Sequence, residues 1–149
     1  MTDHVAADVR RRIMGAVRSR NSGPELLIRS AAHRLGFRFR VHREDLPGTP
    51  DLAFPKWRTV VFVHGCFWHR HPGCPKAGTP KSNVEFWKAK FAANVARDER
   101  NVRDLEALGW DIAIVWQCHA RNLDSATSAL IAALPPRMTA HLDDHGRAR

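Results

Sequence analysis

Three cysteines and one histidine constrain this chain most, because they tie a long loop to a strand far away in the sequence. The four residues are Cys66, His71, Cys74 and Cys118. Three of them follow the spacing C-x4-H-x2-C within a loop predicted at 64–83, and the fourth follows a strand predicted at 111–116. Thiolate and imidazole are ligands that zinc prefers, and a Cys3His set leaves no open position. The pattern predicts a structural zinc that holds the loop against the sheet.

An alternative for this cluster is three reduced thiols beside surface histidines. The spacing alone does not decide whether His71 or His69 is the fourth ligand. An odd number of cysteines argues against a framework of disulfides, and metal binding or reduced thiols remain.

The positive charge of the chain lies mostly in its N-terminal third. The 149 residues, the length of one domain, carry 24 Lys and Arg against 15 Asp and Glu. Residues 1–43 hold ten arginines and three acidic residues, and arginine suits phosphate and narrow grooves. This excess indicates a polyanionic partner, most often nucleic acid, although a basic arm can also serve solubility alone. With no run of 18 apolar residues and no apolar stretch behind the N-terminus, we expect neither a membrane span nor secretion.

Hydrophobic periodicity predicts an α/β fold, a mixed β-sheet flanked by helices. Ser22 and Glu25 have the spacing of a capping box before a helix that ends at Gly36. The chain is expected to divide into a basic arm (1–20), a core (21–135) and a disordered tail (136–149). Helices are predicted at 8–19, 23–35, 84–108 and 122–134, and strands at 37–41, 51–54, 59–63 and 111–116, the last two buried.

Polar residues that could carry chemistry surround the strand at 59–63. Asp51 follows a tight turn and could bind Mg²⁺, although an Asp after Pro is more often a turn former. His64 and His69 could exchange protons near neutral pH, or be loop histidines without a role. Phe67 and Trp68 could form a small local core or wedges that enter a base stack.

Taken together, the chain resembles the very short patch repair (Vsr) DNA mismatch endonucleases. The resemblance spans about residues 10–118 in the expected order, and the motif HGCFWH is very specific. The matching segments are IMGAVRSRNSGPE (13–25), LPGTPD (46–51), VVFVHGCFWHRH (60–71) with Cys74, EFWKAKFAANVARD (85–98) and LGWDIAIVWQC (108–118).

This resemblance implies a restriction-endonuclease-like fold with a structural zinc, and a Mg²⁺-dependent nick on the 5′ side of the thymine in a T:G mismatch. Such mismatches arise when 5-methylcytosine is deaminated. By position, Asp51 and the carbonyl of Val63 would bind magnesium. His69 would be the general base, His64 would support the scissile phosphate, and Glu25 would be an active-site neighbour.

The resemblance also assigns the residues that would bind zinc and DNA. The zinc ligands map to Cys66, His71, Cys74 and Cys118. Phe67, Trp68 and Trp87 would intercalate beside the mismatch, although the helical stripe position of Trp87 favours core. The N-terminal arm, with Met14, Arg18 and Arg20, would cross the minor groove.

Two departures from the family pattern remove no catalytic group. Val63 stands where threonine is expected, and Gln117 replaces a glutamate before the last cysteine. The expected partner is double-stranded DNA with a T:G mismatch, bound by a monomer in the bacterial cytoplasm at the nucleoid, and other repair proteins could be further partners. The alternatives are a zinc-stabilised DNA-binding module without catalysis, and a related nuclease for other damaged or unpaired nucleic acid.

Overall fold

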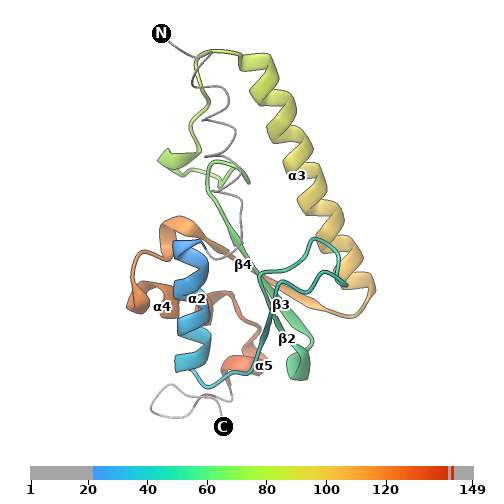
Figure 1. Ribbon diagram of the computed structural model, residues 1–149, viewed down its shortest axis with the longest axis vertical. Coiled ribbons are helices and arrows are strands. Elements are labelled where there is room, and N and C mark those ends of the chain that lie inside the picture. The colour runs from blue at the N-terminus through green and yellow to red at the C-terminus, as the bar shows by residue number, and fades with distance from the viewer. Residues whose placement is uncertain (1–21, 141, 143–149) are drawn as a thin grey trace.

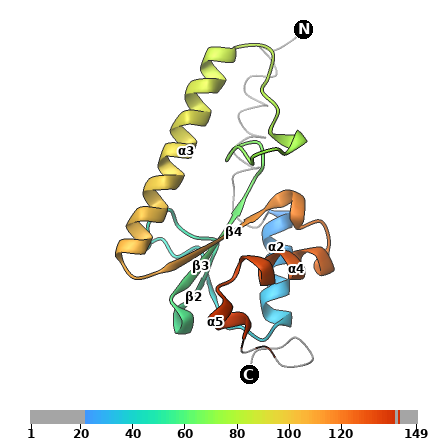
Figure 2. The same cartoon turned by 180° about the vertical axis from the view of Figure 1, so that it is seen from behind.

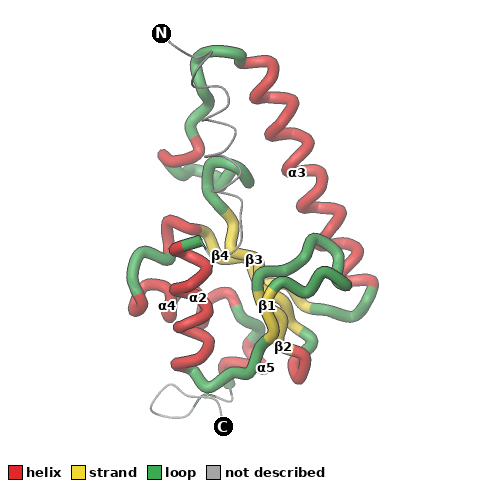
Figure 3. Tube along the Cα trace, viewed as in Figure 1, coloured by secondary structure: helices red, strands yellow, loops and turns green. Residues whose placement is uncertain are grey.

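A four-stranded mixed sheet forms the centre of the computed structural model, which describes residues 22–140 and 142. The strand order is β1-β2-β3-β4, with antiparallel pairing up to β3 and a parallel β3–β4 pair. Figure 3 shows the strands gathered at the centre of the molecule. The mixed sheet predicted from the sequence is confirmed. The strands are β1 (Arg40–Val41), β2 (Leu52–Phe54), β3 (Thr59–His64) and β4 (Asp111–Trp116).

Helices cover the two faces of this sheet (Figures 1 and 2). The pair α2 and α4 packs on one face together with the short α5, and the long α3 packs by its C-terminal end on the other. The N-terminal half of α3 projects beyond the sheet, alongside the loop that follows β3. The helices are α2 (Gly23–Arg34), α3 (Val84–Ala107), α4 (Leu123–Ala133) and α5 (Pro136–Thr139).

The core has two layers because the central strands are apolar on both faces. Phe54 and Val61 point toward α2 and α4, where Ile28 and Leu130 are fully buried. Val60 points to the opposite face, which Leu105 of α3 and Trp110 close. This confirms the prediction that the strand at 59–63 is buried on both sides. A rigid β3 therefore delivers His64, at its C-terminal end, to a fixed place.

Two predicted elements differ from the structure. β4 is an edge strand with alternating burial rather than a buried one, and Ile114 is 36% exposed. Only Arg40–Val41 of the segment 37–41 pairs as a strand, because Phe37 leaves the ladder to pack against Phe54, with ring centroids 5.7 Å apart. The helix predicted at 122–134 is α4, and Leu123 in its first turn is exposed.

The predicted disorder after residue 135 is wrong for the part that the structure describes. Pro135 and Pro136 do end α4, but Pro136 also begins α5, since proline is well suited to the first turn of a helix. Met138 then fills a fully buried position in the core. Burial of one large side chain is enough to fix this short helix. The helix predicted at 8–19 lies outside the described residues.

Within residues 22–140 no helix has both the length and the apolar character needed to span a membrane.

Candidate active site and metal centre

Asp51 lies at the point where the β2–β3 pair meets the N-terminus of α2. The amide of Val63 donates a hydrogen bond to Asp51 Oδ2 at 2.7 Å, so one carboxylate oxygen is fixed by the neighbouring strand. The antiparallel register of β2 and β3 brings residues 51 and 63 together, and the turn before Asp51 lets its side chain face the strand end. The fixed carboxylate is suited to bind a cation.

Two further groups, Glu25 and His42, share this corner with Asp51. Glu25 is 3% exposed, and its Oε2 lies 2.8 Å from Nε2 of His42 and forms an ion pair with Arg29. Ligand atoms of Glu25, His42 and Asp51 all lie within 4.8 Å of one another. The pKa of Asp51 is raised to about 7, chiefly by burial; the hydrogen bond from the Val63 amide opposes this rise, and the charge of Glu25 adds to it.

Sequence reasoning missed His42 and Arg29. The backbone amide of His42 donates to the carbonyl of Asp51 at 3.3 Å, so it continues the β1–β2 pairing. Its φ of 49° is in the left-handed region, an uncommon conformation for a non-glycine residue. No sequence signal marks His42, since only the pairing of β1 with β2 brings it beside Asp51.

His64 and His69 form the opposite wall with Asp98 of α3. The two imidazole rings stack with centroids 3.8 Å apart and planes 5° from parallel. Nδ1 of His69 lies 2.6 Å from Oδ2 of Asp98. Burial lowers the pKa of His64 to about 3, and the neighbouring His69 adds to this effect, so His64 is uncharged at neutral pH.

Asp98 was also missed, although it closes one of the matching sequence segments. Burial, the largest single effect, tends to raise the pKa of this carboxyl, but the hydrogen bond with His69 and the nearby positive charge together outweigh it, and the pKa is lowered. An ionised carboxylate on Nδ1 orients the imidazole and leaves Nε2 free for proton transfer.

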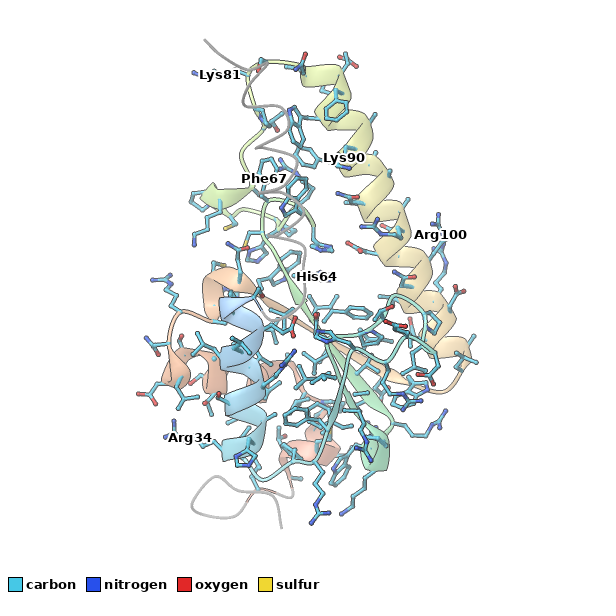
Figure 4. All side chains as sticks on the ribbon, viewed as in Figure 1. Arg34, His64, Phe67, Lys81, Lys90 and Arg100 are labelled. Atoms are coloured by element: carbon cyan, nitrogen blue, oxygen red, sulfur yellow. The ribbon has the colours of Figure 1, made fainter. Side chains whose placement is uncertain are left out.

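A single pocket of about 470 Å³ joins these two walls. It is lined by all four residues assigned catalytic roles from the sequence, together with Asp98 and polar groups from α3. These four residues are Glu25, Asp51, His64 and His69. In Figure 4 His64 lies near the centre of the molecule, at the end of β3. The arrangement combines a corner whose donors could hold a cation with a histidine whose orientation is fixed.

The Cys and His residues of the loop converge beside this pocket, at the end of β4. Ligand atoms of Cys66, His71, Cys74 and Cys118 lie within 4.8 Å of one another. Nδ1 of His71 is 3.6 Å from Sγ of Cys66 and 3.4 Å from Sγ of Cys118. Tetrahedral zinc with ordinary bond lengths would place such atoms about 3.5 Å apart, so the set fits zinc.

The choice between His71 and His69, which the spacing left open, follows from this geometry. His71 joins the cysteines and stacks on Trp116, whereas His69 turns toward Asp98. All three cysteines are free of disulfides. Burial raises the pKa of the Cys66 thiol to about 11. Because metal ligation requires the thiolate, binding at this position would release a proton.

The three aromatic residues expected to intercalate pack together between the loop and α3. Trp68 and Trp87 are buried with Phe91, and Phe67 packs against all three, with ring centroids 5.0 to 5.6 Å apart. Phe67 lies beside α3 in Figure 4. In this conformation the cluster is a small local core, and its apolar faces would have to open to enter a base stack. Phe86, 60% exposed at the start of α3, is an aromatic that sequence reasoning did not single out.

Met14, Arg18 and Arg20, expected in the DNA-binding arm, lie outside the described residues.

One family model and several known proteins match this chain. Residues 2–75 match the family model of the DNA mismatch endonuclease Vsr. The chain is 49% identical over 136 residues to the type II nicking enzyme V.XorIIP of Xanthomonas oryzae pv. oryzae, covering 91% of this chain and 99% of that protein. It is 40% identical over 114 residues to the DNA mismatch endonuclease Vsr of Escherichia coli, covering 76% and 72% of the two chains. The type II nicking enzyme V.NmeAIP of Neisseria meningitidis is 39% identical over 122 residues, with 82% and 86% covered.

The pocket, the excess of basic residues in the sequence and these relatives define an enzyme that cuts DNA. The chain belongs to the Vsr family of DNA mismatch endonucleases.

Proposed function

We propose that this enzyme uses catalytic Mg²⁺ to nick the strand on the 5′ side of the thymine in a T:G mismatch. Its fold would be restriction-endonuclease-like and stabilised by a structural zinc. Repair of deaminated 5-methylcytosine would begin with this nick. The observation that carries the proposal is the single pocket in which Glu25, Asp51, His64 and His69 meet. The enzyme would act on chromosomal DNA, and therefore at the bacterial nucleoid.

The corner at Asp51 fits magnesium by the chemistry of its donors. Two carboxyl groups, Asp51 and Glu25, lie close together there, and a divalent cation would offset their repulsion. Magnesium takes oxygen ligands and keeps several waters, so one protein carboxylate can suffice. Asp51 and the carbonyl of Val63 would hold it. When bound, the ion would stabilise negative charge on the phosphate and on the leaving oxygen.

His69 would act as the general base. Asp98 holds Nδ1 of His69, so Nε2 would accept the proton of the attacking water. The water oxygen would form a bond to phosphorus while the bond from phosphorus to the leaving sugar oxygen breaks. His64 stacks on His69 and fixes the plane of its ring. Because His64 is uncharged at neutral pH, it would contact a phosphate only as a hydrogen-bond donor.

The zinc assignment rests on the Cys3His set and its distances. A Cys3His site is closed to substrate, so the role would be structural. The ion would connect the loop that carries His69 to the end of β4.

Recognition of the mismatch would use the aromatic cluster and the N-terminal arm. Phe67, Trp68 and Trp87 would unstack the bases at a cost of a few kcal/mol, which is lowest where pairing is already imperfect. The mismatch itself would thus be the first filter. Met14, Arg18 and Arg20 would contact the minor groove side.

Strand-specific cleavage of end-labelled duplexes with Mg²⁺ tests the proposal. The substrates are a T:G mismatch in several flanking contexts, a U:G mismatch, and matched T:A and C:G controls. We expect one nick 5′ of the mismatched T, absent on matched DNA and lost in Asp51→Ala protein that still binds. Equal cutting of matched duplexes would contradict T:G specificity, and full activity of Asp51→Ala would contradict the assigned site.

A further inference from the structure

The candidate active-site pocket is rich in acidic groups and has one permanent cation among its described lining residues. Three carboxyl groups line it, those of Glu25, Asp51 and Asp98. The single Lys or Arg among those lining residues is Arg97 of α3. A phosphodiester brings a negative charge into this pocket, so the position of the one arginine matters for the reaction.

Arg97 lies on the face of α3 that is turned toward the end of β3. Residues three and four apart share a helix face, and Asn94, Arg97 and Asp98 have this spacing. Both neighbours are anchored: Asn94 Nδ2 donates to the carbonyl of Trp68 at 3.2 Å, and Asp98 holds His69. These two contacts fix the rotation of the helix and so direct Arg97 to the same pocket.

Arg97 is exposed and, within the described part of the chain, forms no ion pair. Other arginines of the fold are engaged: Arg29 with Glu25, Arg43 with Asp45 and Arg137 with Asp111. The neighbouring Asp98 is bound by His69. The guanidinium of Arg97 is therefore available to an incoming anion at the mouth of the pocket.

We propose that Arg97 is a catalytic residue whose guanidinium contacts the non-bridging oxygens of the scissile phosphate. This inference rests on the proposed function of the pocket. As the water oxygen bonds to phosphorus and its proton passes to His69, negative charge grows on those oxygens until the bond to the sugar oxygen breaks. The planar, always charged guanidinium offers two parallel N–H groups that match two phosphate oxygens. Arg97 thereby supplies a positive charge that His64 and His69 do not carry permanently.

Single-turnover nicking with enzyme in excess separates this role from DNA binding. The variants are Arg97→Ala, Arg97→Lys and, as a matched control, Arg100→Ala, measured on the duplex that the wild type nicks fastest. Arg100 is an arginine of the same helix on its outer side, away from the sheet (Figure 4). For each variant the dissociation constant is measured separately, and guanidinium ion is added back to Arg97→Ala.

Removing a fixed group that stabilises the charge developing in a transition state reduces rates by about 100-fold in comparable sites. We expect a reduction of this size in the nicking rate of Arg97→Ala. Its dissociation constant should change by less than about 5-fold, since one phosphate contact is a small part of the total. Guanidinium ion should restore part of the rate, Arg97→Lys should be intermediate, and Arg100→Ala should nick like the wild type.

Equal rates for Arg97→Ala and Arg100→Ala at saturating enzyme would overturn the inference. So would a loss confined to the dissociation constant, which would make Arg97 an anchor for DNA only. Asp51→Ala separates failure of the Arg97 role from failure of the proposed active site. If Asp51→Ala is inactive and Arg97→Ala is unimpaired, only the role of Arg97 fails; if Asp51→Ala is fully active, the proposed active site fails and Arg97 with it.

Discussion

Glu25 shows at the scale of one residue how a local sequence signal can be diverted. The spacing of Ser22 and Glu25 predicts a reciprocal capping box, and Ser22 does cap the helix, accepting from the amide of Glu25 at 3.4 Å. The carboxylate of Glu25 instead contacts Arg29 and His42 beside Asp51. The helix start gives up one of its two capping interactions, and the pocket gains a buried carboxylate.

Substitution of Asp51 by Asn should stabilise the magnesium-free protein while abolishing nicking. Because the pKa of Asp51 is raised to about 7, above its unfolded value, ionisation of this group costs stability as the pH rises through that range. At pH 8 we expect Asp51→Asn to be more stable by roughly 1–3 kcal/mol, since each pKa unit corresponds to about 1.4 kcal/mol and Glu25 shares the effect. Urea unfolding without added Mg²⁺ or chelator measures this.

The difference in unfolding free energy between Asp51→Asn and the wild type should become smaller as the pH falls from 8 to 5.5. At pH 8, added Mg²⁺ should stabilise the wild type but not the variant. If the wild type is more stable than Asp51→Asn at pH 8 without Mg²⁺, ionisation of the buried Asp51 does not lower the free energy of unfolding, and this prediction is wrong.

Replacement of Asp98 by Asn should slow nicking without weakening DNA binding. Asn cannot stabilise a protonated His69, and it can hold the imidazole in the wrong tautomer. Loss of such a partner costs about 10- to 100-fold. Single-turnover rates compared with Asp104→Asn, an exposed carboxyl of the same helix, test this. Equal rates for the two variants would mean that Asp98 does not position His69.

Sequence reasoning identified the residues of the pocket that belong to specific motifs and missed those that reach it by tertiary packing. Asp51, His64 and His69 lie in short motifs whose chemistry can be argued from the sequence. His42 and Asp98 could not be found in this way, because a histidine beside an arginine-rich strand and an aspartate on a charged helix match ordinary surface patterns. Only the β1–β2 register and the rotation of α3 bring them to the site.

At the scale of elements, the loop between β3 and α3 has little core of its own and depends on its Cys and His residues. We therefore expect Cys74→Ala to lose zinc and to have a melting temperature lower by about 10 °C. A structural ion contributes several kcal/mol of stability, and each kcal/mol corresponds to about 3 °C. His119→Ala is the control, because His119 contacts His71 by its ring only. Zinc content by atomic absorption and calorimetry would reveal the difference; unchanged zinc in Cys74→Ala would refute the ligand set.

The aromatic cluster between this loop and α3 should determine the preference for mismatched DNA. Replacing both Phe67 and Trp68 by Ala keeps the side chains of Asp51, His64 and His69 but deletes the aromatic faces that would enter the stack. We expect the ratio of nicking rates on T:G and matched duplexes to fall by at least about 10-fold, because stacking contributes about 1–3 kcal/mol per base. Phe86→Ala, at a neighbouring exposed aromatic, serves as the comparison. Full preference in the double variant would contradict the wedge mechanism.

Helices and strands with strong periodicity could be predicted, and those decided by packing could not. The helix predicted at 84–108 matches α3 to within a residue of its observed ends. The apolar stripe that predicted it consists of Trp87, Phe91, Val95, Val102, Leu105 and Leu108, of which Leu108 is 52% exposed because the helix ends just before it. β4 has the composition of a buried strand, but its place at the sheet edge depends on the topology. α5 is too short for any periodic signal and exists because Met138 finds a buried site.

At the scale of the whole molecule, the excess of positive charge should govern DNA binding more than folding. Residues 1–20 contain five arginines and precede the described core. A chain lacking them should melt within a few degrees of the full protein but bind DNA at least about 10-fold more weakly at 0.1 M salt. Its affinity should also fall less steeply with salt. The slope of log K against log salt concentration should become smaller by up to about 0.9 for each phosphate that the arm no longer neutralises. Unchanged affinity and slope would exclude the arm as a region that binds DNA.

The chain between Cys66 and His71 carries Phe67, Trp68 and His69, so residues proposed to open the duplex and to take a proton lie between two proposed zinc ligands. Reactivation of chelated protein should therefore be ordered. Magnesium given first would reach an enzyme whose base and wedge are misplaced, and nicking would resume only after zinc is returned. Protein treated with a strong chelator and then given magnesium alone should therefore stay inactive until zinc is added.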